Sequence, residues 1–190
     1  MVRIFLAFPL PLNLRKQLKQ MFSGYSNAAG FRWTPEENLH ITIFFIGEVE
    51  EEKIPLIREK IQGVLSQQSS IHLEFEQFEF RGHSRKPSMF WARFKKSENF
   101  SVLSAKVASE VHQYMTIKIQ HQDPIPHITI ARLKRESEVD AISPESFAKI
   151  ELPEIDYAEL WQTVHTPSGV KYLSLDKFDF GKKQKKVFLR

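Results

Sequence analysis

The tetrapeptide His40-Ile41-Thr42-Ile43 returns unchanged as His127-Ile128-Thr129-Ile130. In an extended strand, alternate side chains point to the same face, so the histidine and threonine of each copy share one face and the isoleucines take the other. The apolar face can pack in a core and leave an imidazole and a hydroxyl directed at a common site. The two copies therefore predict two strands that face one site suited to binding a phosphate.

Two imidazoles are suited to acid–base chemistry at phosphorus. The ordinary pKa of histidine is about 6.5, so a neutral imidazole can accept a proton from a nucleophile while an imidazolium donates one to a leaving oxygen. The hydroxyls of Thr42 and Thr129 can donate to the non-bridging oxygens, where charge develops. We therefore predict His40 and His127 as catalytic residues and both threonines as phosphate-binding residues, with no metal and no cofactor.

The remaining histidines show no spacing typical of a metal site. They form no His-x-His, His-x3-His or HExxH pattern, and the chain has no cysteine to complete a zinc site. They are His72, His83, His112, His121 and His165. We expect them at the surface or at element ends. The basic loop at residues 82–87, which contains His83, is either a contact for an RNA backbone or a solvated loop.

Composition and charge are consistent with a globular protein that has an anionic partner. The chain has 190 residues, is 42% hydrophobic and carries a formal net charge of +4. The basic residues after Gly181 form either a solvated tail or a further RNA contact. No apolar run approaches the ~20 residues of a membrane span, and the N-terminal residues do not match a signal peptide. These features predict a cytoplasmic protein that does not enter a membrane.

Hydrophobic periodicity predicts a mixture of strands and helices. Apolar residues at intervals of three and four indicate helices over residues 11–23, 51–65 and 100–114. Thr34-Pro35-Glu36-Glu37 is a capping-box pattern with room for about one helical turn. Alternating or β-branched runs indicate strands at residues 2–8, 39–46, 71–80 with a bulge near Gln77, 88–94 and 127–132. Apolar residues between 147 and 160 and the run at 170–180 indicate further strands, joined by a turn at residues 167–169.

The order of these elements favours an α+β fold. A strand, a helix and a His-x-Thr strand come first, and a similar series follows, without a glycine-rich phosphate loop. We expect two similar lobes whose antiparallel sheets face a central cleft, with helices on the outer faces. Residues 1–190 would then form a single bilobal domain with a pseudo-twofold internal duplication, present as a monomer.

Four segments resemble the two-histidine phosphoesterases, most closely the LigT-like RNA 2',3'-cyclic phosphodiesterases, long labelled 2'-5' RNA ligases. These segments are residues 3–11, 32–49, 126–132 and 169–172. The resemblance implies a metal-independent enzyme that opens a terminal 2',3'-cyclic phosphate on an RNA end or nucleotide to a 2'-phosphate. It also implies that His40 is the general acid, which protonates the departing 3'-oxygen, and His127 the general base, which activates water.

Arg132 matches the arginine of the family, which implies a third phosphate-binding residue. Strict alternation nevertheless puts Arg132 on the face opposite His127, so an anion-binding role requires a twist or bulge in the strand, and a structural ion pair is the alternative. The chain also departs from the family at Phe80-Arg81-Gly82, where the family commonly has proline after phenylalanine. We expect the edge of the substrate site to differ there.

Among the aromatic residues, most of which we expect in the core, Phe44 shares the phase of His40 and Thr42. It is therefore predicted to be the residue placed to stack on a base. Three alternatives to the predicted hydrolase remain open. The first is a 2'-5' RNA ligase, which joins a cyclic phosphate end to a 5'-hydroxyl. The second is a phosphodiesterase that acts on another cyclic or 2'-5' phosphodiester, and the third is a non-catalytic RNA-binding module.

Overall fold

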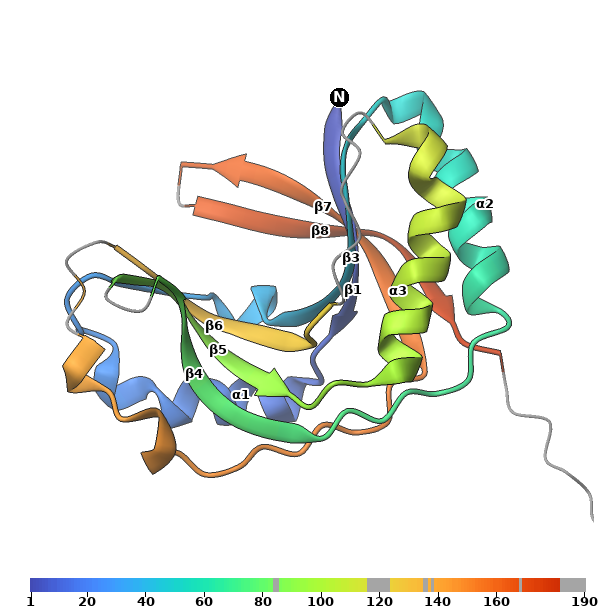
Figure 1. The fold of residues 1–190 in the computed structure, drawn as a ribbon. Coiled ribbons are helices and arrows are strands. Elements are labelled where there is room, and N and C mark those ends of the chain that lie inside the picture. Colours follow the sequence, from blue (N-terminus) through green and yellow to red (C-terminus); the bar gives the residue numbers. More distant parts are fainter. Residues whose placement is uncertain (84–85, 116–123, 135–136, 138, 168, 182–190) are drawn as a thin grey trace, which may run out of the picture.

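The structure, a computed structural model, describes residues 1–83, 86–115, 124–134, 137, 139–167 and 169–181. Its strands form one antiparallel sheet in the order β4-β5-β6-β3-β1-β7-β8, and β2 also pairs with β6 (Figure 1). The strands are β1 (Val2–Pro9), β2 (Phe31–Trp33), β3 (His40–Val49), β4 (Phe75–His83), β5 (Lys86–Phe94), β6 (His127–Leu133), β7 (Tyr157–Thr166) and β8 (Gly169–Asp179). The helices are α1 (Leu12–Met21), α2 (Ile54–Leu65) and α3 (Glu98–Val111). Single 3₁₀ turns lie at Ser23–Tyr25, Glu36–Asn38, Glu51–Lys53, His112–Tyr114, Val139–Ala141 and Pro144–Ser146.

The helices pack on the apolar face of the sheet, as predicted. Phe22 at the end of α1 contacts the rings of Phe78 and Phe90 on β4 and β5. On the other half of the sheet, the ring of Phe100 in α3 meets that of Phe8, and the buried Ser104 hydroxyl donates to the Ile43 carbonyl at 2.8 Å. In Figure 1, α2 and α3 lie side by side next to β1 and β3. The opposite face of the motif strands is therefore left to the histidines and threonines.

The predicted α+β class with antiparallel strands and outer helices is confirmed, and the two halves meet at the repeated motif. Strand β3 pairs with β6 through one register position, Ile41 opposite Ile128, and both side chains are fully buried. From this contact β4–β6 and β1, β7 and β8 extend to the two sides (Figure 1). The sheet is thus continuous across both halves. The assignment of residues 1–190 to one duplicated domain stays a prediction.

Both motif strands bulge at the same position of the repeat. On β3, Thr42 lies opposite Ala7 but Phe44 lies opposite Leu6, so Ile43 is an extra residue. On β6, the residues before and after Ile130 pair with consecutive residues of β5, so Ile130 is the extra residue there. Each bulge shifts the alternation by one, and the residue five positions after each histidine joins the histidine face.

Two local predictions are wrong for reasons that the structure gives. The bulge turns Phe44 toward the core and leaves Phe45, which is 49% exposed, on the face of His40. The turn Glu36–Asn38 has no side-chain cap, because the Thr34 hydroxyl donates instead to the Thr129 carbonyl at 2.7 Å. The predicted bulge in β4 is present, between Phe75 and Gln77 in its pairing with β5. Residues 84–85 of the basic loop, residues 116–123 and the basic tail at 182–190 lie outside the described residues.

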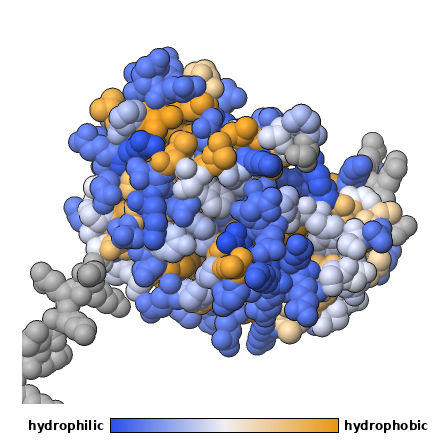
Figure 2. Space-filling view, turned by 180° about the vertical axis from the view of Figure 1, so that it is seen from behind, coloured by the Kyte–Doolittle hydropathy of each residue, from blue (hydrophilic) through white to orange (hydrophobic). Residues whose placement is uncertain are grey.

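The surface on the side of α2 and α3 carries exposed apolar residues. Figure 2 shows a mostly hydrophilic face with hydrophobic residues gathered at its upper left, the side on which these helices lie. Leu56 of α2 and Val102 of α3 are among the exposed large side chains. No helix in the described part of the chain is both long and apolar enough to cross a membrane.

Replacing Ile128 tests the junction of the two halves. We expect Ile128→Ala to lower the free energy of unfolding by about 2–5 kcal/mol, because it leaves a cavity at the only register pair between β3 and β6. Leu173→Ala, at a side chain that is 50% exposed, should change it by less than about 0.5 kcal/mol. Urea unfolding measures both, and an unchanged midpoint for Ile128→Ala would contradict the role of this junction.

Candidate active site

The two histidines and two threonines of the repeat lie together on one face of the sheet. Because β3 and β6 are antiparallel and pair through the second residue of each motif, the register sets His40 opposite Thr129 and Thr42 opposite His127. Cross-strand neighbours have Cβ atoms about 5 Å apart, and diagonal neighbours such as the two histidines about 7–8 Å. All four side chains are partly exposed. The predicted set therefore converges as a crosswise quartet that spans the width of a phosphate group.

His40 is held by a backbone carbonyl and a hydroxyl. Its Nδ1–H donates to the Asn38 carbonyl at 2.6 Å, and its Nε2 accepts from the Thr42 hydroxyl at 3.0 Å. A carbonyl can only accept, so the contact with Asn38 fixes the tautomer and leaves Nε2 as the reactive nitrogen. Three aromatic rings have centroids 5.1–5.2 Å from that of the imidazole, those of Phe5, Trp161 and Tyr172. The environment of His40 is therefore aromatic and largely apolar.

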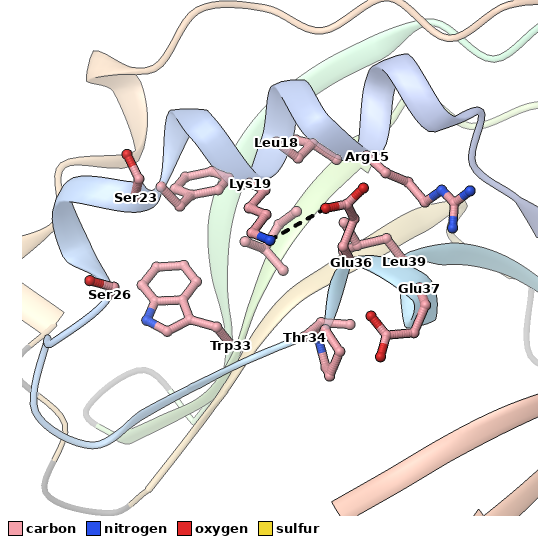
Figure 3. A pocket seen from close by; sticks show the side chains of 13 residues that line it. Arg15, Leu18, Lys19, Ser23, Ser26, Trp33, Thr34, Glu36, Glu37 and Leu39 are labelled. Carbon is pink, nitrogen blue, oxygen red and sulfur yellow. Dashed lines mark ion pairs between the residues drawn. The ribbon is translucent and has the colours of Figure 1, made fainter.

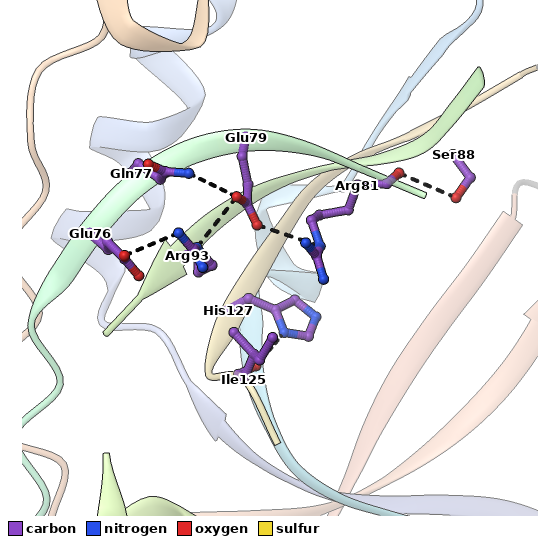
Figure 4. Close-up of polar contacts among 8 residues, drawn as sticks. All are labelled: Glu76, Gln77, Glu79, Arg81, Ser88, Arg93, Ile125 and His127. Atoms are coloured by element: carbon purple, nitrogen blue, oxygen red, sulfur yellow. Dashed lines mark hydrogen bonds and ion pairs between the residues drawn. The ribbon is translucent and has the colours of Figure 1, made fainter. Parts of the chain in front are cut away.

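His127 is held in an equivalent way but has a different neighbourhood. Its Nδ1–H donates to the Ile125 carbonyl at 2.7 Å, again two residues before the histidine. Its ring stacks on the indole of Trp91, with centroids 3.6 Å apart and planes 16° from parallel. The guanidinium carbon of Arg81 lies 5.3 Å from the centroid of the same indole, and Glu79 forms an ion pair with Arg81 (Figure 4). The environment of His127 is therefore aromatic on one side and charged beyond it.

Both imidazoles are neutral near pH 7. Burial lowers the pKa of His40 to about 4, and the charges of His127 and Arg132 act in the same direction. Burial also lowers the pKa of His127, assisted by Arg81 and Arg132, while Glu79 and the Ile125 hydrogen bond oppose the shift. In the ligand-free site both imidazoles are therefore able to accept a proton.

The bulge in β6 brings Arg132 to the same face as the histidines. Ile130 and Ala131 are both buried in succession, and Arg132 is exposed. Its charge lowers the pKa of both histidines. The bulge thus supplies the change of face that the predicted anion-binding role of Arg132 requires, and that role stays a prediction.

The remaining histidines stay outside this quartet. Those at positions 72, 83, 112 and 165 are exposed, and His121 lies outside the described residues. In the described ranges no group of three His, Cys, Asp or Glu side chains is arranged to hold a metal ion.

Several residues of the site are absent from the sequence-based prediction. Asn38 is almost fully buried, and besides its carbonyl bond to His40 its amide donates to the Val170 carbonyl of β8 at 2.8 Å. Trp91 was expected in the core. Its place in the site follows from its pairing with Thr129, which only the register of β5 and β6 reveals. Tyr172 lies in a segment that resembles the family, but its contact with His40 requires the β7–β8 hairpin.

A separate cavity lies between α1 and the segment that leads into β3. It has a volume of about 660 Å³ and is lined by Leu18, Phe22, Trp33 and Ile130, with Arg15, Lys19 and Glu36 among its polar residues (Figure 3). An ion pair of 3.5 Å joins Lys19 to Glu36. Because Ile130 belongs to the core face of β6, this cavity lies on the opposite side of the strand from the quartet.

Comparisons with known proteins find relatives in sequence and in fold. The family model for LigT-like phosphoesterases matches residues 8–91, which include the first motif. The chain is 28% identical to an RNA 2',3'-cyclic phosphodiesterase of Archaeoglobus fulgidus, over 94% of this chain and 100% of that protein, and 26% identical to one of Thermotoga maritima, over 94% and 96%. Among solved structures, TT0787 of Thermus thermophilus has a TM-score of 0.80 at 21% identity, covering 95% of this chain and 99% of that one. LigT of Escherichia coli in complex with 3'-AMP has a TM-score of 0.74 at 21% identity, covering 94% and 97%.

The low pKa of His40 predicts a pH dependence of stability. Between its ordinary value of 6.5 and about 4, the unfolded chain takes up a proton that the folded protein does not, so the free energy of unfolding falls as the pH falls through this window. The slope from one such group is at most about 1.4 kcal/mol per pH unit. The variant His40→Asn should lose less stability over the same window. Urea titrations of both proteins measure the difference, and parallel pH curves would contradict the shift.

Proposed function

We propose that this chain is a member of the LigT-like phosphoesterase family and hydrolyses a terminal 2',3'-cyclic phosphate of RNA to a 2'-phosphate. His40 acts as general acid and His127 as general base. The single observation that supports this most strongly is the crosswise quartet, in which each imidazole lies opposite the hydroxyl of the other motif. The names of the full-length relatives support the substrate class. Each half contributes one histidine, so we also propose that residues 1–190 act as one unit and as a monomer.

The reaction needs five groups with separate tasks. The cyclic phosphate lies between the two imidazoles, where the hydroxyls of Thr42 and Thr129 and the guanidinium of Arg132 bind its non-bridging oxygens. His127 Nε2 removes a proton from a water that attacks phosphorus in line with the 3'-oxygen. The bond from phosphorus to the 3'-oxygen breaks, and His40 gives its proton to that oxygen. The products are a 2'-phosphate and a 3'-hydroxyl.

The negative charge of the substrate favours the protonated form of the proposed acid, His40. In the free site His40 is neutral, and its Nε2 is occupied by the Thr42 hydroxyl. When Thr42 turns its hydroxyl to the phosphate, Nε2 becomes free, and the negative charge beside it raises the pKa of His40. The acid is thus loaded with its proton in the complex rather than in the free protein.

The assigned roles also orient the nucleoside. The leaving 3'-oxygen lies beside His40, so the ribose and base extend toward the aromatic residues on that side. Phe45 is the exposed member of this group, with its ring 5.6 Å from that of Phe5. We propose that Phe45 stacks on the terminal base in place of the predicted Phe44.

Replacing each histidine tests the division of labour. We expect His40→Ala and His127→Ala each to lower kcat/KM on a 2',3'-cyclic phosphate by at least about 100-fold, with RNA affinity largely kept. A substrate with sulfur in place of the 3'-oxygen needs no acid, so it should restore much of the activity of His40→Ala and little of that of His127→Ala. If this substrate instead restored the activity of His127→Ala, His127 would be the acid and His40 the base.

Product analysis separates the remaining alternatives. Chromatography identifies a 2'-phosphate for the proposed hydrolysis, and a joined strand with a 2'-5' bond when a 5'-hydroxyl RNA is supplied. Wild-type protein that binds RNA but turns over no 2',3'-cyclic end would rule out the proposed function and favour an RNA-binding module.

The proton uptake predicts different pH profiles for kcat and kcat/KM. Activity falls as the pH rises through the pKa of the acid, and bound phosphate raises that pKa. We therefore expect the descending limb of the kcat profile at higher pH than the descending limb of the kcat/KM profile. Steady-state kinetics between pH 4 and 9 measures both, and coincident limbs would show that the phosphate does not load the acid.

The stacking of Phe45 has its own test. Phe45→Leu should raise KM for adenosine 2',3'-cyclic phosphate about tenfold, because base stacking contributes about 1–3 kcal/mol. The cyclic phosphate of 1-O-methylribose has no base, so its KM should not change. Phe44→Leu is the matched control, and equal effects of Phe45→Leu on both substrates would contradict stacking.

A further inference from the structure

The two catalytic neighbourhoods differ most at the strand next to each motif. The threonine of the first motif lies opposite Ala7 on β1, and that of the second lies opposite Trp91 on β5. These positions correspond, because both motif strands bulge at the residue that follows the threonine. The first position holds a methyl group and the second holds an indole. The two motifs therefore differ at this position, where the indole of Trp91 stacks on His127.

The indole of Trp91 restrains the ring plane of His127. A stack with centroids 3.6 Å apart and an interplanar angle of 16° leaves little room for the imidazole to tilt. The Nδ1 bond to the Ile125 carbonyl at 2.7 Å fixes which edge of the ring faces the backbone. Together the two contacts define the direction of Nε2, for which no hydrogen-bond partner exists among the described residues. By contrast, the aromatic contacts of His40 are tilted or edge-on.

Arg81 adds a positive charge beyond the indole. Its guanidinium lies 5.3 Å from the indole centroid, and its side chain is anchored by Glu79 at 3.5 Å. Glu79 is itself held by Arg93 at 3.4 Å and by the Gln77 amide at 2.8 Å (Figure 4). The carboxylate of Glu79 thus forms ion pairs with two arginines. It is therefore a weak counter-charge for an imidazolium at His127. Arg81 is also the residue at which the sequence departs from the phenylalanine–proline pattern of the family.

We propose that Trp91 and Arg81 are positioning residues for His127, which together hold its imidazole in line with the phosphate and keep it in the neutral, proton-accepting form. The inference rests on the proposed role of His127 as the base. Neither residue acts on the reacting atoms. Trp91 acts through the ring plane, and Arg81 acts through charge.

The charges around His127 make this assignment specific. The groups that face it are Arg81 and Glu79 on β4, Arg93 on β5, Arg132 on its own strand and His40 on β3. Glu79 favours the imidazolium and the others oppose it, and the contribution of Arg81 is the largest of the charge contributions to His127. Removing Arg81 also frees Glu79, so the pKa of His127 should rise.

NMR titration of the imidazoles tests the proposal without substrate, so it is independent of the proposed reaction. The His127 resonance is assigned by its loss in His127→Asn. We expect its midpoint to rise by about half a pH unit or more in Arg81→Met and in Trp91→Leu, and by less in Trp91→Phe, which keeps a ring. Lys95→Met removes the same charge at a surface ion pair with Glu74 and should leave the midpoint unchanged. Trp161→Leu should move the midpoint of His40 only.

Kinetics then separates positioning from substrate contact. For Trp91→Leu we expect kcat to fall about tenfold with little change in KM, and Trp91→Phe should retain most of the activity. For Arg81→Met we expect the ascending limb of kcat/KM to move to higher pH, because the base must be unprotonated. An unchanged His127 midpoint in both variants would overturn the proposal, as would a higher KM at constant midpoint in Arg81→Met, which indicates a phosphate contact. If the wild-type protein hydrolyses no cyclic phosphate, the proposed function fails while the NMR result still decides whether the stack controls His127.

Discussion

The candidate site depends on the antiparallel pairing of β3 with β6 at Ile41 and Ile128. Side chains alternate along a strand, so a slip of one residue at this junction would turn one histidine and its threonine into the core. The two isoleucines oppose such a slip because both are fully buried at the junction. The polar quartet is therefore held in register by the hydrophobic side chains between its members. The geometry of the candidate site thus depends on the packing of the two halves.

The repeated motif lies on two strands that bulge at the same position, and the neighbouring strands make their surroundings unequal. Five residues after the histidine, the common bulge exposes Phe45 on β3 and Arg132 on β6. Beside the threonine stands Ala7 in one half and Trp91 in the other. The half around His40 is consequently aromatic, while the half around His127 carries charge. Two similar strands thus give the proposed acid and the proposed base different surroundings.

Much of this could be predicted from the sequence, and the failures share one cause. The repeated motif predicted both motif strands, because four residues are enough to show polar and apolar side chains in alternation. Three- and four-residue spacing predicted the helices in the same way. The bulges could not be predicted from the sequence, because an extra residue is defined only by its pairing with a partner strand. Strict alternation therefore favoured Phe44 over Phe45 and put Arg132 on the wrong face. The stack of Trp91 on His127 likewise depends on how β5 pairs with β6.

Arg132, whose positive charge lowers the pKa of both histidines, is also a predicted phosphate-binding residue. Burial keeps both imidazoles neutral in the free site, and the charge of Arg132 lowers both pKa values further. In the proposed reaction, the negative charge of a bound phosphate raises the pKa of His40, and the phosphate takes the Thr42 hydroxyl from His40 Nε2. By linkage, a ligand that raises the pKa of a group binds more tightly at a pH where that group is protonated. Phosphate binding and protonation of the proposed acid are therefore coupled.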